Sequence, residues 1–263
     1  MQSEPEPVAE QEALAPLPDG YRAVVLGSTG AIGRELVAEL VSSTKCGSVV
    51  AVTRRVLAEG VTCGKFPAEH VGACFPRLAA SVQGSQGLAK LEIAVVDWEA
   101  LCSGAAHNDL FAGAHFVACC LGTSRAAEGG KAGFERCDLD YTSAAAQLAR
   151  DAGCPQYTLV TSKGASATSY IFYMKIKGKQ EVAAKALGFP RLTIFQPGAL
   201  NRGDELRKQR NAERFMGFIG MTGIDVALVG RALMVDAEQR PDNSEQTTFV
   251  VYGDGDIRRL AAM

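Results

Sequence analysis

The stretch SYIFYMKIKGK, residues 169–179, combines tyrosine and lysine side chains at a spacing that suits proton transfer. Tyr173 and Lys177 are four residues apart, so they share one face if the stretch is helical. Tyrosine ionises only at about pH 10, and a neighbouring ammonium group favours its phenolate form. The pair therefore predicts a group that gives or takes a proton on a substrate oxygen. The alternative is an amphipathic helix with Tyr173 half buried, and Tyr170, which lacks a lysine at the same offset, is expected to pack.

A serine precedes this pair at the end of an apolar run. Ser162 closes QYTLVTS and lies eleven residues before Tyr173. Its hydroxyl is expected to donate a hydrogen bond to the substrate oxygen and to hold that oxygen beside Tyr173. The predicted catalytic residues are therefore Ser162, Tyr173 and Lys177.

Three glycines follow the first apolar run at a spacing that suits phosphate binding. In VVLGSTGAIGREL they permit a tight turn, a close approach of the backbone to a pyrophosphate, and close packing of the next helix. The N-terminus of that helix presents unpaired N–H groups and a partial positive charge. The motif therefore predicts a dinucleotide site. The residues expected to form it are Gly27, Ser28, Thr29, Gly30, Ala31, Ile32 and Gly33.

Two arginines stand where a dinucleotide fold selects its nucleotide, at the end of the second strand pattern in AVTRR. An acidic residue there accepts a hydrogen bond from a free 2′-hydroxyl, whereas Arg54 and Arg55 offer charge-assisted donors to a 2′-phosphate. The sequence therefore predicts NADP(H) rather than NAD(H), with a solvated strand end as the alternative. Asp97, after the third strand, is expected either to contact the adenine or to cap the next helix.

The fourth strand pattern ends in CCLGTSR, where a glycine lets a ligand pass close to the backbone. Leu121, Gly122 and Thr123 are therefore expected to flank the cofactor ribose, although an ordinary strand-ending turn is the alternative. Lys177 would bond the nicotinamide ribose. Hydride would then move between the nicotinamide and a carbonyl carbon while Tyr173 handles the proton on oxygen.

Short apolar runs alternate with helical patterns along the chain, which is typical of a parallel sheet with crossover helices. We expect a Rossmann-type doubly wound parallel sheet in one domain, residues 21–263, with a small C-terminal substrate-side lobe at 201–263. Helices are expected at 31–43, 132–152, 170–187 and 224–236. Strands are expected at 22–27, 47–53, 91–97, 115–122, 156–162, 191–197 and 246–253.

Residues 56–90 interrupt this alternation and are expected to be a loop insertion. They contain Cys63, His70 and Cys74, which are too few for a structural zinc site, so no metal is expected. The eight cysteines of the chain show no repeating C-x-x-C spacing, which favours reduced thiols over a disulfide framework.

Residues 1–18 mix prolines with glutamates and are expected to form a flexible acidic tail. The formal net charge of −2 gives no overall basic field that would recruit nucleic acid. There is no apolar run of membrane-spanning length and no leader pattern at the N-terminus. We therefore expect a cytoplasmic protein, with the nucleus as the alternative.

Taken together, these motifs resemble the atypical or extended short-chain dehydrogenase/reductase superfamily, and within it the Tat-interacting-protein family. The resemblance spans about residues 21–200. It rests on GSTGAIGREL, TRR, CCLGTSR, KAGFERCDLDYTSAAAQLARDAGC, TSKGA, YMKIKGKQEVAAKAL and QPGAL.

The resemblance implies further assignments. QPGAL would run beside the nicotinamide through Pro197, Gly198, Ala199 and Leu200. Gln196 stands where many relatives have arginine, and Asp138 stands where the superfamily often has an asparagine that relays protons. Members of the narrower family are regulators that contact other proteins. Two functions are therefore implied, an NADP(H)-dependent oxidoreductase acting on a small carbonyl or alcohol, and an NADPH-binding regulatory protein with little or no turnover.

Overall fold

A central eight-stranded sheet organises the chain, in the order β10-β7-β6-β5-β1-β2-β4-β3. The computed structural model describes residues 15–57, 62–81, 88–107, 109–123, 129–202, 223–239 and 249–263. All neighbouring strands of this sheet run parallel except β3 (Cys63–Lys65), which is antiparallel to β4. The parallel strands are β1 (Tyr21–Leu26), β2 (Cys46–Thr53), β4 (Leu91–Val95), β5 (Phe116–Cys119), β6 (Gln156–Val160), β7 (Arg191–Phe195) and β10 (Phe249–Tyr252).

The chain reverses its direction of growth across the sheet at β1. From β1 it proceeds to β2 and β4 on one side, then returns to β5 on the other side of β1 and continues to β6, β7 and β10. Such a switch point, at the carboxyl ends of the strands, is where open α/β sheets bind ligands. The structure therefore confirms the expected Rossmann-type fold, and its switch point lies between the carboxyl ends of β1 and β5.

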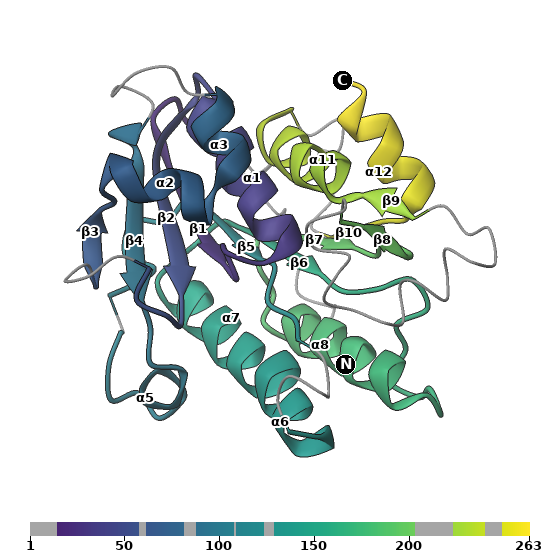
Figure 1. Ribbon diagram of the computed structural model, residues 1–263. Coiled ribbons are helices and arrows are strands. Elements are labelled where there is room, and N and C mark those ends of the chain that lie inside the picture. Colours follow the sequence, from purple (N-terminus) through teal and green to yellow (C-terminus); the bar gives the residue numbers. More distant parts are fainter. Residues whose placement is uncertain are drawn as a thin grey trace, which may run out of the picture.

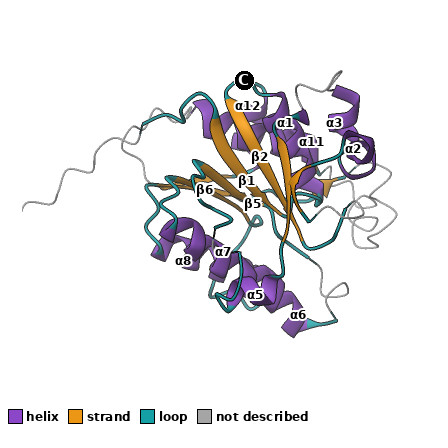
Figure 2. Ribbon diagram, turned by 90° about the vertical axis from the view of Figure 1, so that its left-hand side faces the viewer, coloured by secondary structure: helices purple, strands orange, loops and turns teal. Residues whose placement is uncertain are grey.

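Helices cover both faces of the sheet, as Figures 1 and 2 show. Because apolar helices lie on both sides, the side chains of β5, β6 and β7 are buried along each whole strand. One face carries α1 (Ala31–Ser42), α2 (Ala68–Cys74), α3 (Pro76–Ser81), α11 (Val226–Gln239) and α12 (Asp254–Ala261). The other carries α5 (Trp98–Cys102), α6 (Lys131–Glu135), the π-helical turn η1 (Arg136–Tyr141), α7 (Thr142–Asp151) and α8 (Phe172–Ala186).

The expected strands are all present, and the expected helices need small adjustments. The helix expected at 132–152 runs through α6, η1 and α7, so it contains a π-helical turn that the periodicity did not indicate. The helix expected at 224–236 begins at Val226, because Ile224 and Asp225 form β9, which pairs with β8 (Leu200–Asn201). Helix α12 was not expected.

The described parts of residues 56–90 include regular structure. Strand β3 adds to the sheet, and Val71 of α2, Phe75 between the two helices and Leu78 of α3 are buried in the same core as Leu36 of α1. Most of the predicted tail, residues 1–14, lies outside the described residues. So do residues 203–222 and 240–248 of the predicted lobe.

A buried ion pair fastens the C-terminal elements to the sheet. Arg191 at the start of β7 donates from Nη2 to Asp236 Oδ1 of α11 at 2.9 Å, and both side chains are at most 1% exposed. The hydroxyl of Tyr252 in β10 donates to the same oxygen at 3.0 Å. One carboxylate therefore joins β7, β10 and α11.

Candidate functional site

The glycine loop after β1 has a conformation that requires two of its three glycines. Gly27 has φ of +71°, and a Cβ there would lie 2.8 Å from the carbonyl oxygen of Cys120. A Cβ on Gly33 would lie 2.2 Å from the carbonyl oxygen of Gly27. A side chain at Gly27 would therefore push the loop away from the end of β5, and one at Gly33 would separate the loop from α1. The loop is held against the two strands that flank the switch point.

The N-terminus of α1 is the part of this loop that suits an anion. Gly30 is its N-cap residue and is exposed, and no side chain caps it. Thr29 is exposed and Ala31 half buried, whereas Ser28 and Ile32 are buried. A helix start without a side-chain cap leaves backbone N–H groups for a ligand. The loop therefore fits a pyrophosphate held by backbone groups.

Ser28 contacts the neighbouring strand β2, and the two arginines directly follow that strand. The Ser28 hydroxyl donates to the carbonyl of Val52 at 2.8 Å, so its side chain ties the loop to β2. Arg54 and Arg55 follow the last residue of β2 and are exposed. The backbone N–H of Arg55 donates to Thr53 Oγ1 at 3.2 Å. The geometry thus places two guanidinium-bearing residues one strand away from the glycine loop.

Asp97 caps a helix, as one of the two sequence interpretations expected. Its Oδ1 accepts hydrogen bonds from the backbone N–H groups of Glu99 and Ala100, at 2.9 and 3.2 Å, at the start of α5. Its own N–H donates to His107 Nε2 at 3.2 Å, and His107 has the left-handed φ of 66°. The capping role is confirmed, and a contact with adenine stays a prediction.

The end of β5 meets helix α8 at a lysine. A Cβ placed on Gly122 would lie 3.6 Å from Lys177 Nζ and 3.7 Å from Asp138 Oδ1. The N–H of Thr123 donates to Asp138 Oδ2 at 3.0 Å. Leu121 is half buried and contributes to the core on the α7 side of the sheet. The predicted ribose segment and the predicted catalytic lysine are therefore adjacent, although 55 residues separate Gly122 from Lys177 in the sequence.

Tyr173 and Lys177 share one face of α8, as predicted, but differ in exposure. Tyr173 is 38% exposed and its ring packs on Phe134, with centroids 5.8 Å apart. Lys177 is 4% exposed, and its Nζ lies 2.8 Å from Asp138 Oδ1. Burial would lower the pKa of the Lys177 ammonium, but the interaction with Asp138, with a smaller contribution from Tyr173, outweighs burial and holds that pKa above its ordinary value. Lys177 is therefore a charged group inside the protein, next to a tyrosine at its surface.

Outside the Tyr173–Lys177 pair, Ile171 and Lys175 of the stretch are exposed, whereas Ile176 and Gly178 are buried. Tyr170 is fully exposed, so the expectation that it packs is wrong. It precedes the first residue of α8 by two positions and lies outside the helical face that the packing argument assumed.

Ser162 follows β6 and is half buried. Its hydroxyl donates only a long contact, 3.5 Å, to the carbonyl of Lys163. Among the described contacts none joins Ser162 directly to Tyr173, so their cooperation stays a prediction. The loop that follows Ser162 is nevertheless fastened to α8, because the N–H of Ser166 donates to the carbonyl of Met174 at 3.1 Å.

Gly178 permits this loop to lie on α8, and sequence reasoning missed it. A Cβ on Gly178 would lie 2.1 Å from both the N atom of Ala167 and the carbonyl carbon of Ser166. The glycine in MKIKGKQ was a signal, because glycine inside a helix is unfavourable unless another backbone approaches it closely.

Gly178→Ala is expected to displace the loop that carries Ser162, with a loss of about 1–3 kcal/mol in the free energy of unfolding and about a hundredfold loss of turnover. Denaturant unfolding and steady-state kinetics measure the two effects. The control is Gly255→Ala in α12, where nothing lies within 4 Å of the added Cβ. Helix propensity predicts that this control is neutral or slightly stabilising. Wild-type stability in Gly178→Ala would contradict the close approach.

The QPGAL segment is anchored by polar contacts of its first three residues. Gln196, which is half buried, donates from Nε2 to Oε1 of the buried Glu181 at 2.8 Å. Gly198 donates its N–H to Asp254 Oδ1 at 2.8 Å. The carbonyl of Pro197 accepts from the N–H of Lys163 at 2.9 Å, which links the segment to the Ser162 loop. Ala199 and Leu200 are half buried, and their contact with a nicotinamide stays a prediction.

Comparison with known proteins gives relatives over most of the chain, although no family model matches. The rat protein HTATIP2 is 29% identical over 217 residues, which are 80% of this chain and 78% of the rat protein. The mitochondrial protein FMP52-1 of Scheffersomyces stipitis is 34% identical over 178 residues, which are 68% of this chain and 66% of that protein. The mitochondrial protein FMP52 of Meyerozyma guilliermondii is 32% identical over 179 residues, which are 68% of this chain and 65% of that protein.

The predicted resemblance to the short-chain dehydrogenase/reductase superfamily is confirmed. The chain's likeness to HTATIP2 also confirms the resemblance to the Tat-interacting-protein type. Solved structures of the superfamily share the fold at low identity. A short-chain type dehydrogenase/reductase from Mycobacterium ulcerans has a TM-score of 0.59 and 16% identity, covering 92% of this chain and 91% of that one. The dTDP-glucose 4,6-dehydratase DesIV from Streptomyces venezuelae has a TM-score of 0.59 and 14% identity, covering 92% and 79%.

The described residues contain no group of three or more histidine, cysteine, aspartate or glutamate side chains that could hold a metal ion. All eight cysteines carry free thiols. Within the described ranges no helix has both the length and the apolar character to cross a membrane.

Proposed function

We propose that this protein is an NADP(H)-dependent oxidoreductase that interconverts a small carbonyl compound and its alcohol. The observation that carries the proposal is the buried Lys177 ammonium, which lies next to Gly122 at the end of β5 and one helical turn from Tyr173. A lysine in this position faces the sheet switch point where dinucleotides bind in such folds. A half-exposed tyrosine beside it is accessible to a small substrate.

Each group of the chain at this site has its own role in binding or in proton transfer. The glycine loop and the N-terminus of α1 hold the pyrophosphate, and Lys177 donates to the nicotinamide ribose. Ser162 donates a hydrogen bond to the carbonyl oxygen and orients it. Tyr173 gives its proton to that oxygen during reduction and takes it back during oxidation. The bound cofactor supplies the hydride.

The two arginines after β2 support NADP(H) as the cofactor. Both are exposed beside the glycine loop, and no acidic residue occupies either position. Changing both, Arg54→Ala with Arg55→Ala, is expected to weaken NADPH binding by about 10- to 100-fold, because each lost bond to a phosphate is a charge-assisted one. NADH binding should change little.

Fluorescence titration measures this prediction. Trp98 is the only tryptophan of the chain and follows Asp97 directly, so energy transfer from it to NADPH reports binding. Arg258→Ala in α12 is the control for loss of an exposed positive charge. A wild-type protein that binds NADH more tightly than NADPH, or binds neither, would refute the proposal.

A second function is supported by the similarity to HTATIP2. A regulatory protein that binds NADPH with little or no turnover would need the glycine loop and the arginines but not Tyr173. Protein partners and cellular location likewise stay predictions. The sequence suggests the cytoplasm or nucleus, whereas the FMP52 relatives are named as mitochondrial proteins.

A further inference from the structure

Asp138 is a completely buried carboxylate that the proposed reaction does not use directly. It is 0% exposed and lies in the π-helical turn η1, between α6 and α7. A buried carboxylate costs free energy unless charges and hydrogen bonds compensate it. π-Helical turns are uncommon and frequently mark functional positions.

The two oxygens of Asp138 join two different parts of the site. Oδ1 lies 2.8 Å from Lys177 Nζ on α8. Oδ2 accepts the hydrogen bond from the N–H of Thr123, in the segment after β5, at 3.0 Å. One side chain therefore connects the predicted catalytic lysine to the backbone over which the cofactor ribose is expected to lie.

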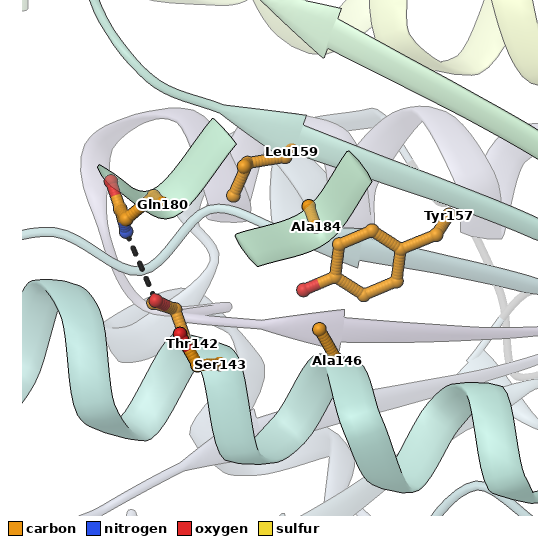
Figure 3. Close-up of a pocket in the computed structure, with 7 residues that line it drawn as sticks. All are labelled: Thr142, Ser143, Ala146, Tyr157, Leu159, Gln180 and Ala184. Carbon is orange, nitrogen blue, oxygen red and sulfur yellow. Dashed lines mark hydrogen bonds between the residues drawn. The ribbon is translucent and has the colours of Figure 1, made fainter. Parts of the chain in front are cut away.

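A second pair of contacts fixes the backbone that carries Asp138. The hydroxyl of Thr142 donates to the carbonyl of Asp138 at 2.9 Å, and Gln180 Nε2 donates to Thr142 Oγ1 at 3.1 Å. Figure 3 shows this Gln180–Thr142 bond crossing between α8 and α7, at the edge of a small pocket. Gln180 is 2% exposed and follows Lys177 by three residues. The Lys177–Asp138 and Gln180–Thr142 contacts therefore come from one face of α8.

The ionisable groups that face Lys177 come from three elements. They are Asp138 from η1, Tyr173 from α8 and Cys119 from β5. Burial raises the pKa of the Cys119 thiol, so that group stays neutral. Asp138 is thus the carboxylate that compensates the buried ammonium. Without Asp138, burial would lower the pKa of Lys177 with little to oppose it.

We infer that Asp138 is a positioning residue that keeps Lys177 charged and fixes it beside Gly122, and that it couples this lysine to the Thr123 backbone. The part of this inference that concerns the cofactor rests on the proposed function. The part that concerns the ion pair does not.

Asp138→Asn tests the inference, because the amide oxygen can still accept from Thr123 N–H while the negative charge is lost. Titration of the lysine side chains by NMR, with isotope-labelled lysine and no cofactor, follows the charge of Lys177 directly. The signal is identified by its loss in Lys177→Met. Its midpoint is expected to fall by at least about two pH units in Asp138→Asn. A midpoint within about half a unit of wild type would overturn the inference.

Asp140→Asn is the matched control. Asp140 lies in the same turn but is exposed and pairs with Arg136 at 3.0 Å. This control should leave the Lys177 midpoint unchanged, and an equal fall in both variants would overturn the inference. If Asp138→Asn does not fold, Asp138→Asn with Lys177→Met should fold again, because neither buried charge remains. A double variant that also fails to fold would count against the pair.

Two pH-dependent measurements complete the test. In Asp138→Asn the folded protein loses the Lys177 proton at a lower pH than the unfolded chain, so the melting temperature should rise with pH across that interval. In wild type the raised pKa means that the pair's stabilisation persists to alkaline pH, so no such rise is expected. NADPH affinity should weaken by about tenfold in the variant as Lys177 loses its charge. Absence of NADPH binding by wild type would refute the proposed function and leave the NMR result standing.

Discussion

Tyr173→Phe is expected to lower NADPH-dependent reduction of small carbonyl compounds by about 10²- to 10⁴-fold, the contribution that a positioned general acid typically makes. The affinity for NADPH should stay within about twofold of wild type, because the proposed cofactor contacts come from the glycine loop, Arg54, Arg55 and Lys177. Loss of NADPH absorbance measures turnover, and fluorescence titration measures binding.

The substitution removes one oxygen atom and leaves the packing of the ring in place. The Tyr173 ring contacts Phe134 with centroids 5.8 Å apart and an interplanar angle of 49°, an arrangement that phenylalanine can keep. Lys177 keeps its ion pair with Asp138, since that contact does not involve the phenol. A fall in rate would therefore report the missing proton donor rather than a disturbed helix.

Tyr170→Phe is the matched control, because Tyr170 is a fully exposed tyrosine three residues earlier. It should retain wild-type turnover. Equal rates in Tyr173→Phe and wild type would contradict a catalytic role. If wild type binds NADPH but reduces none of a broad panel of carbonyl compounds, the proposed regulatory function would be favoured.

The parts of the site that could be predicted are those whose signal is local in the sequence. The glycine loop requires glycine at Gly27 and Gly33 for reasons that the short motif contains, namely a left-handed turn and close packing. The spacing of Tyr173 and Lys177 likewise follows from helix geometry alone. The strands were identifiable because residues buried on both faces form nearly continuous apolar runs.

The parts that could not be predicted depend on contacts between distant segments. Asp138 and Lys177 are 39 residues apart and meet only because η1 packs against α8. No short motif encodes that pairing. The need for glycine at Gly178 was equally unpredictable, because it arises from the backbone of Ser166 and Ala167, which lies against the helix. Tyr170 was expected to pack because it was assigned to the helix, whereas α8 starts only at Phe172.

The ion pair between Arg191 and Asp236 is the strongest case of such a distant contact, and breaking it should cost the most stability. The sequence RLTIFQP gave no indication that its arginine is buried, yet Arg191 is 1% exposed. A guanidinium group does not lose its proton in proteins, so burial cannot neutralise Arg191. Asp236→Asn would therefore leave a charge uncompensated inside the protein, and we expect a loss of about 3–5 kcal/mol in the free energy of unfolding.

Urea unfolding of three variants separates the interaction energy of the Arg191–Asp236 pair from the effects of changing each residue alone. Asp236→Asn and Arg191→Met should each be strongly destabilised, whereas the double variant should recover much of the loss because no lone charge remains. The amide of the asparagine can still accept from Tyr252, so that contact does not confuse the comparison. Single losses that simply add in the double variant would contradict the coupling.

Glu135→Gln provides the exposed counterpart, since Glu135 pairs with Lys179 at 3.1 Å with about 40% of each side chain exposed. Its removal should change the free energy of unfolding by at most about 1 kcal/mol. The contrast matters for function because β7 continues into QPGAL, which contacts the Ser162 loop through Pro197 and Lys163. A loosened Arg191–Asp236 pair should therefore lower turnover before it unfolds the protein.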